Sequence, residues 1–309
     1  MQVWSFDGET WREGDLEGSA LRWIDVVGPD RAEMDALAAR FGLHHLAIDD
    51  CVSLLPHAPK IDEFDDHLFI VFHAFVQHDD QVETEELNAF LGRDFLITYR
   101  DRELPIMPLV YRLIAENRIF RPGADGLLYE ILDRVVDEAL PLVNNLGTRM
   151  DEMQEAAVDP RVRLSNSQVL AIRASAGKLR RLLNPQLNVI QRLSRGEFDQ
   201  VAESNRMYFR DIYDHLVRID FALEELREDA EVALNSYLNV VNNRLSEVMK
   251  VLSVVAVLSL PATVITGIFG TNFDDIPGLH SNWGFAAMLG AMAALSGSMI
   301  VFFKRRGWF

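Results

Sequence analysis

The sequence predicts an α/β domain, then a long-helix stalk, and finally two C-terminal transmembrane helices. Three observations lead to this fold class. The first ~120 residues contain β-rich runs, the middle of the chain carries a sustained helical pattern, and the last part holds two uncharged apolar runs. We therefore expect an N-terminal domain at 1–122, a helical stalk at 123–249 and a membrane domain at 250–309.

The N-terminal part has the signals of a small α/β domain. Residues 30–41 show a helical pattern, and residues 67–77 are rich in β-branched and aromatic side chains. Residues 86–91 and 94–99 flank Gly92-Arg93, which predicts a hairpin.

Histidines in this part invite a zinc-site interpretation, but they show no recognised ligand spacing. Cys51 is the only cysteine, so no thiolate zinc cluster can be built within one chain. We interpret these histidines as scattered structural residues: His44, His45, His57, His67, His73 and His78.

The stalk is predicted to consist of helices. Residues 125–159 and 163–194 form two of them, separated at Asp159-Pro160. Between Gly196 and Pro261 there is neither Gly nor Pro, and apolar residues recur every three or four positions, which is typical of one helix. At ~1.5 Å per residue it is roughly 95 Å long. We expect it to run directly into the first apolar run, with the two shorter helices packed against it.

Negative charge is concentrated ahead of the membrane domain. Up to Met249 the chain has 45 acidic and 26 basic residues, a net charge of −19. Such a surface repels phosphate backbones, because nucleic-acid binding relies on Lys and Arg displacing counterions. We expect no nucleic-acid partner and an attraction for metal cations.

The two apolar runs cover residues 251–270 and 284–303, each about the length needed to cross a lipid bilayer. Lys250 precedes the first run, Lys304-Arg305-Arg306 follows the second, and the loop at 271–283 has no Lys or Arg. By the positive-inside rule both ends of the chain are cytoplasmic and the loop faces outward. The expected location is the inner membrane, with two passes.

Residues around the first run carry a specific motif. The segment opens with Glu247-Val248-Met249-Lys250, contains Pro261 and ends with Gly270-Thr271-Asn272. It resembles the CorA family of divalent metal-ion channels, whose members carry Gly-Met-Asn at that end. Weaker similarity at 59–64 and 68–71 extends the resemblance to the N-terminal domain.

The resemblance implies a funnel-shaped homopentamer. The first membrane helix of each subunit lines a central pore, and the second helices form an outer ring facing lipid. The implied function is gated uptake of a divalent cation, Mg²⁺ above all, with Co²⁺ and Ni²⁺ as further ions. It implies no cofactor apart from the transported cation, and the sequence shows no catalytic motif.

One stripe of the first helix suits the pore, because its members recur every three or four residues. By resemblance, Met249 and Leu252 form a hydrophobic gate, which blocks ions by excluding water. The residues expected to line the pore beyond the gate are Ala256, Leu260, Thr263 and Gly267.

The pore mouth, where ions are selected, is assigned by resemblance to Gly270, Thr271 and Asn272. Five copies of Asn272 would hold a metal ion through its hydration shell, which suits Mg²⁺ because this ion dehydrates reluctantly. Asp274 and Asp275 in the outward loop would concentrate cations outside that mouth.

Thr271 stands where the family has Met, and its hydroxyl favours hard Mg²⁺ slightly more than a thioether does. Zinc-transporting relatives of the ZntB type also vary this position, so proton-coupled Zn²⁺ transport stays open. A membrane-anchored coiled-coil scaffold without transport is an alternative of another class, but it leaves the Gly-Thr-Asn mouth unexplained.

Overall fold

The computed structural model describes residues 1–15, 18–28, 31–53, 55–79, 81–119, 121, 123–158, 166–271, 276–278 and 280–307. The chain divides into two compact units, the N-terminal unit Met1–Leu234 and the C-terminal unit Asn235–Phe309. The sequence predicted three parts, with boundaries at 122 and 249 that follow the expected helices and strands. This three-part division differs in kind from a division into compact units, and it stays a prediction.

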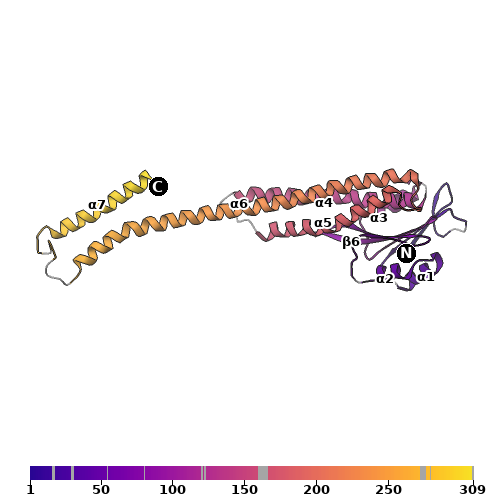
Figure 1. Ribbon diagram of the computed structural model, residues 1–309, viewed down its shortest axis with the longest axis horizontal. Helices are drawn as coiled ribbons and strands as arrows, with labels where there is room; N and C mark the ends of the chain where they lie inside the picture. The colour runs from indigo at the N-terminus through magenta and orange to yellow at the C-terminus, as the bar shows by residue number, and fades with distance from the viewer. Residues whose placement is uncertain are drawn as a thin grey trace. The chain divides into compact units, whose positions relative to one another are not determined.

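The N-terminal unit contains a seven-stranded sheet, which lies beside one end of the long helices (Figure 1). Its strand order is β2-β1-β3-β7-β6-β5-β4. Strands β3 and β7 pair in parallel, and the other pairs of described strands are antiparallel. The strands are β1 (Gln2–Phe6), β2 (Trp11–Glu13), β3 (Leu21–Val27), β4 (Lys60–Glu63), β5 (Leu68–His78), β6 (Gln81–Leu91) and β7 (Phe95–Arg100).

Helices cover both faces of this sheet, which explains why β5 is apolar along most of its length. Helices α1 (Arg31–Phe41) and α2 (His45–Cys51) pack on one face around Phe69 and Phe90. The other face carries a larger core, to which α3 (Met107–Ala115) and α4 (Ala124–Val158) contribute. Figure 1 shows α1 and α2 across the sheet from α4.

Helices α5 (Asn166–Arg195) and α6 (Glu203–Phe269) complete that larger core. Asp125 at the start of α4 fixes the start of α6, because one carboxylate oxygen accepts from the backbone N–H of Ala202 (2.8 Å) and the side-chain amide of Asn205 (2.9 Å). Arg180 of α5 is 2.8 Å from Asp220 of α6. These contacts align the three helices within the N-terminal unit.

The C-terminal unit consists of the end of α6 and helix α7 (Gly284–Arg305). Both helices hold a stretch that is long and apolar enough to cross a membrane. The helices run in opposite directions, because the ammonium group of Lys250 donates to the carbonyl of Gly307 at 3.1 Å. A side chain at Gly284 would bring a Cβ within 2.1 Å of the Gly278 carbonyl oxygen, so the turn into α7 requires glycine.

The predicted fold class is confirmed, and several elements match closely. The helix expected at 30–41 is α1, the strand at 67–77 is β5, and the hairpin about Gly92 joins β6 to β7. The long helix begins at Glu203 rather than directly after Gly196, and it continues through Pro261. The break at Asp159-Pro160 lies outside the described residues, between α4 and α5.

Candidate ion path and cation-binding cluster

The predicted pore stripe lies on α6 and is open along its whole length within the chain. Met249 is 54% exposed, Leu252 60% and Leu260 66%, although all three are large apolar side chains. The other members are exposed as well: Ala256, Thr263, Gly267 and Gly270. An apolar stripe of this length needs lipid or another subunit to cover it.

The face of α6 opposite the predicted pore stripe is shielded from solvent, because its side chains are buried or half-buried. Val254 is buried, and Leu258, Ile265 and Phe269 are half-buried. At 3.6 residues per turn these residues lie across the helix from the stripe. Phe303 of α7 is buried in the same unit. The membrane part of the chain therefore shields one side of α6 and leaves the predicted pore side free.

Hydroxyl groups on the membrane part of α6 are satisfied by the helix itself. Thr263 donates to the carbonyl of Ser259 at 3.0 Å, and Thr266 donates to the carbonyl of Ala262 at 2.8 Å. A hydroxyl whose hydrogen is used in this way keeps its oxygen lone pairs free. On the exposed stripe, Thr263 thus presents an oxygen that can accept a hydrogen bond from hydrated cations.

At its C-terminal end α6 closes with a tight turn. The N–H of Gly270 donates to the carbonyl oxygen of Thr266 at 2.9 Å, and a Cβ at Gly270 would lie 3.0 Å from that oxygen. The hydroxyl of Thr271 donates to the carbonyl of Ile268 at 2.8 Å. Asn272, the remaining predicted mouth residue, lies outside the described residues, and so do the loop residues Asp274 and Asp275.

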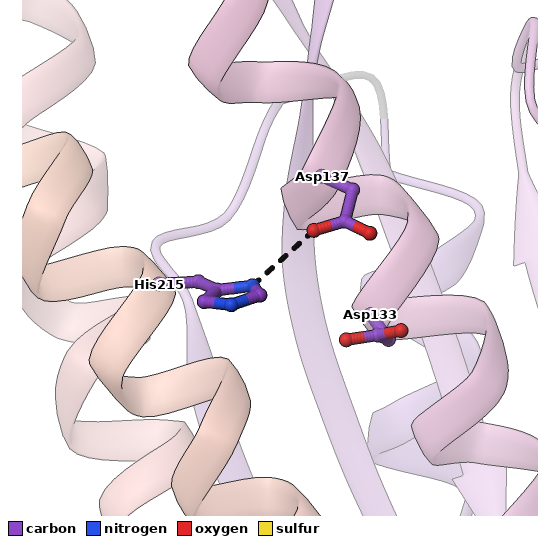
Figure 2. A group of neighbouring side chains, drawn as sticks. All are labelled: Asp133, Asp137 and His215. Atoms are coloured by element: carbon purple, nitrogen blue, oxygen red, sulfur yellow. Dashed lines mark ion pairs between the residues drawn. The ribbon is translucent and has the colours of Figure 1, made fainter.

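A second group of ligand-type side chains joins α4 to α6 in the N-terminal unit. Figure 2 shows Asp133 and Asp137 on α4 facing His215 on α6. Nδ1 of His215 is 3.2 Å from a carboxylate oxygen of Asp137. One ligand atom from each of the three residues lies within 4.8 Å of the others. Two carboxylates and an imidazole at this spacing are suited to holding a divalent cation.

The surroundings of this cluster favour a positive charge. Burial raises the pKa of Asp133, and the nearby charge of Asp137 raises it further, while Arg134 and His215 oppose the rise. Beside the cluster lies a cavity of about 260 Å³, whose lining includes Asp137, His215 and Asn144. A bound cation would relieve the repulsion between the two carboxylates.

Sequence reasoning missed this cluster. Asp133 and Asp137 are four residues apart, which places them on one face of a helix, and that spacing is visible in the sequence. His215 comes from another helix, and the packing that brings α4 beside α6 cannot be read from spacing. The predicted stripe residues, by contrast, lie along one helix, with Gly270 directly after its last residue.

The fold thus combines an α/β unit with a long helix and with two stretches that are long and apolar enough to cross a bilayer. A family model, CorA-like Mg²⁺ transporter protein, matches residues 18–305. The chain belongs to this family, and the resemblance seen in the sequence is confirmed.

Relatives match along nearly their full length. YfjQ of Bacillus subtilis is 34% identical over 291 residues, which are 94% of this chain and 90% of that protein. The cobalt/magnesium transport protein CorA of Thermotoga maritima is 28% identical over 94% of this chain and 84% of its own length. The solved structure of the CorA magnesium transporter from Methanocaldococcus jannaschii shares the fold, with a TM-score of 0.89 and 21% identity over 100% of this chain and 99% of that one.

Proposed function

We propose that the protein transports divalent cations across the inner membrane as a gated channel, with Mg²⁺ as its main ion and Co²⁺ and Ni²⁺ as further ions. The single observation that carries the proposal is the exposed stripe of α6. It leads from Met249 and Leu252 to Thr263 and Gly270, and it lies opposite the shielded face of the same helix.

One copy of α6 cannot enclose a path for ions, so the pore requires several subunits. In the proposed homopentamer, five copies of the stripe face a common axis and α7 faces lipid. This arrangement covers the exposed Leu252 and Leu260, which one chain leaves open. Family membership supports it, and the mass of the detergent-solubilised complex tests it, since five copies of the 35.1 kDa chain are expected.

The stripe changes in character along its length. At the inner end, rings of Met249 and Leu252 would close the pore by excluding water. Further out, Thr263 and the glycines offer hydroxyl and backbone oxygens, which contact a hydrated ion without removing its water. Asn272 completes the mouth, with Asp274 and Asp275 attracting cations outside it.

Inward movement needs no bound energy source. With both chain ends in the cytoplasm, the outward mouth delivers cations toward the negative side of the membrane. The membrane potential contributes about 2.3 kcal/mol per charge per 100 mV, so roughly twice that for a divalent ion.

The Asp133–Asp137–His215 cluster supplies a cytoplasmic cation site in this account. A cation held there would tie α4 to α6, the helix that also carries the pore stripe. Cytoplasmic Mg²⁺ bound at the cluster would thereby favour one arrangement of these helices over another.

Ion flux into proteoliposomes tests the proposal. Wild-type protein should take up Mg²⁺ under a negative-inside potential without a pH gradient, and Asn272→Ala should lose most of this flux while keeping its oligomeric mass. Zn²⁺ uptake that requires a pH gradient would favour proton-coupled Zn²⁺ transport instead. Absence of flux for both ions would leave the non-transporting scaffold as the better account.

A further inference from the structure

A separate cavity of about 110 Å³ lies on the α1–α2 face of the sheet. Its lining comes from the end of α2, from the segment that follows α2 and from strands β5 to β7. His73 and Asn88 line it from β5 and β6, and both are almost fully buried, at 3% and 2% exposed. Neither residue belongs to the predicted ion path or to the cluster between α4 and α6.

The imidazole of His73 presents an unused hydrogen-bond acceptor. Its Nε2 lies 2.7 Å from the backbone carbonyl oxygen of His57, and a carbonyl can only accept, so Nε2 carries the hydrogen. Nδ1 of the neutral ring is then an acceptor, and it is buried without a hydrogen-bond partner among the described residues. Burial lowers the pKa of His73 and so favours the neutral ring, although the His57 carbonyl and the charge of Glu86 act in the opposite direction.

Asn88 presents a second unused acceptor on the same face of the sheet. Its side-chain nitrogen donates to Glu86 at 2.9 Å, while its side-chain oxygen is buried without a partner within the described part of the chain. Glu86 lies directly opposite His73 in the β5–β6 register, and Asn88 follows two residues later on β6, so all three share one face. Burying a polar atom without a partner is costly, so the two acceptors favour an occupant that brings hydrogen-bond donors.

The lining of the cavity is also negatively charged, through Glu85, Glu86 and Asp101. Both carboxylate oxygens of Glu86 already accept hydrogen bonds, at 2.9 and 2.7 Å, so Glu86 contributes charge rather than a free ligand atom. Arg102 lies 3.2 Å from Glu85 and offsets its charge, which leaves the charges of Glu86 and Asp101. The cavity therefore suits a cation that binds through N–H donors.

We propose that this cavity binds the ammonium group of a small primary amine, which donates one hydrogen to Nδ1 of His73 and one to the side-chain oxygen of Asn88. An ammonium group carries donors and no acceptor, so it matches a site whose unused atoms are acceptors. Its positive charge is complementary to the lining carboxylates, and Leu55 and Pro56 supply an apolar wall for a short carbon chain. The site goes beyond the proposed transport function and does not depend on it.

Ordered water is the competing occupant of the cavity. Water also donates hydrogen bonds, and the cavity has room for more than one molecule. Leu55 is 74% exposed, so the cavity lies close to solvent and a small ligand can enter. An ammonium site differs from a water site in one measurable way, because it distinguishes a cation with N–H donors from a cation of the same charge without them.

Thermal unfolding of the purified full-length protein in detergent tests the site. Methylammonium should raise the melting temperature of wild type above its value in tetramethylammonium at the same concentration, since only the first ion can donate to the two acceptors. His73→Phe should lose this difference, or bind methylammonium about tenfold more weakly or worse, because a hydrogen bond to a charged group is removed. Asn88→Leu is a second variant with the same expected result, and circular dichroism checks that each variant is folded.

His67→Phe is the matched control, because His67 is also a buried histidine but stacks between Phe64 and Phe90, and it should keep the full difference. The proposal is overturned if the two ions stabilise wild type equally, as expected for a cavity that holds water alone. It is also overturned if folded His73→Phe and Asn88→Leu keep the full difference. Ion flux plays no part in these readouts, so their failure is separate from failure of the transport proposal.

Discussion

Asp25 and Arg100 form a fully buried ion pair in the sheet of the N-terminal unit. Nη1 of Arg100 is 2.5 Å from a carboxylate oxygen of Asp25, and both side chains are 0% exposed. The hydroxyls of Thr98 and Tyr111 also donate to Asp25. Burying two charges is costly unless each is paired and hydrogen-bonded, so these side chains depend on one another.

We expect Arg100→Met to lower the free energy of unfolding of the N-terminal unit by about 3–5 kcal/mol, because it leaves the Asp25 carboxylate buried and unpaired. Urea unfolding followed by circular dichroism measures this loss. Arg31→Met removes an ion pair with Asp49 whose side chains are both at least half exposed, and it should cost at most about 1 kcal/mol. Equal losses in the two variants would contradict the account.

His67 is buried against Phe64 and Phe90, and neither ring nitrogen has a hydrogen-bond partner within the described chain. Burial lowers its pKa below the ordinary 6.5, and the charge of His44 adds to this, while Asp66 opposes it. The folded state therefore favours the neutral ring. The neutral His67 ring makes its full contribution to stability above pH 6.5, and this contribution is lost as the pH falls through the lowered pKa.

His67→Phe should consequently make unfolding less dependent on pH between 7.5 and 5. The measurement is the urea midpoint at several pH values for wild type and variant. His78→Gln is a suitable control, because the His78 side chain is 60% exposed, and its curve should follow that of wild type. A His67→Phe curve as steep as that of wild type would show that another group is responsible.

At the scale of elements, α6 contributes to the core of the N-terminal unit and also carries the predicted pore stripe. Its periodicity predicted one long helix, and the structure confirms this prediction. The sequence could predict the helix because the periodic signal lies within a single element. The helix continues through Pro261, although a proline removes one helical hydrogen bond and crowds the preceding turn. Strands β1 to β3 were not predicted, because strand formation depends on packing against neighbours, and β3 pairs with β7, which comes much later in the chain.

The gate assignment predicts a gain of flux. Leu252→Asn should raise Mg²⁺ uptake into proteoliposomes at low driving force, because polar side chains allow water into a narrow apolar ring. Leu258→Asn, on the shielded face of α6, should not raise it. If both substitutions change the flux equally, in complexes of unchanged mass, Leu252 does not form the gate.

The α4–α6 cluster predicts stabilisation by cations. Mg²⁺ should raise the melting temperature of wild type, since a ligand that binds only the folded state stabilises it. In Asp137→Asn the shift should be clearly smaller, because one of three ligands is lost. Asp151→Asn, an exposed α4 residue outside the cluster, should behave like wild type. If Asp137→Asn keeps the full shift, the cation binds elsewhere.

For the whole molecule, the sequence predicted the order of its parts and the two membrane helices, because hydropathy and charge act over long segments. It could not predict sites made by different elements. The approach of His215 to Asp133 and Asp137 has no spacing signal, since it depends on how α4 and α6 pack. The stripe on α6 could be predicted from spacing along one helix, because it does not depend on packing between different elements.

The central claim, that this stripe lines the ion path, is tested by cysteine accessibility. In a Cys51→Ser background, Thr263→Cys lies on the stripe and Ile265→Cys on the shielded face of the same helix. A cationic, membrane-impermeant thiol reagent added outside should block Mg²⁺ flux through Thr263→Cys and leave Ile265→Cys unaffected. Block at Ile265→Cys alone, or unchanged flux at both positions despite complete labelling of Thr263→Cys, would contradict the account.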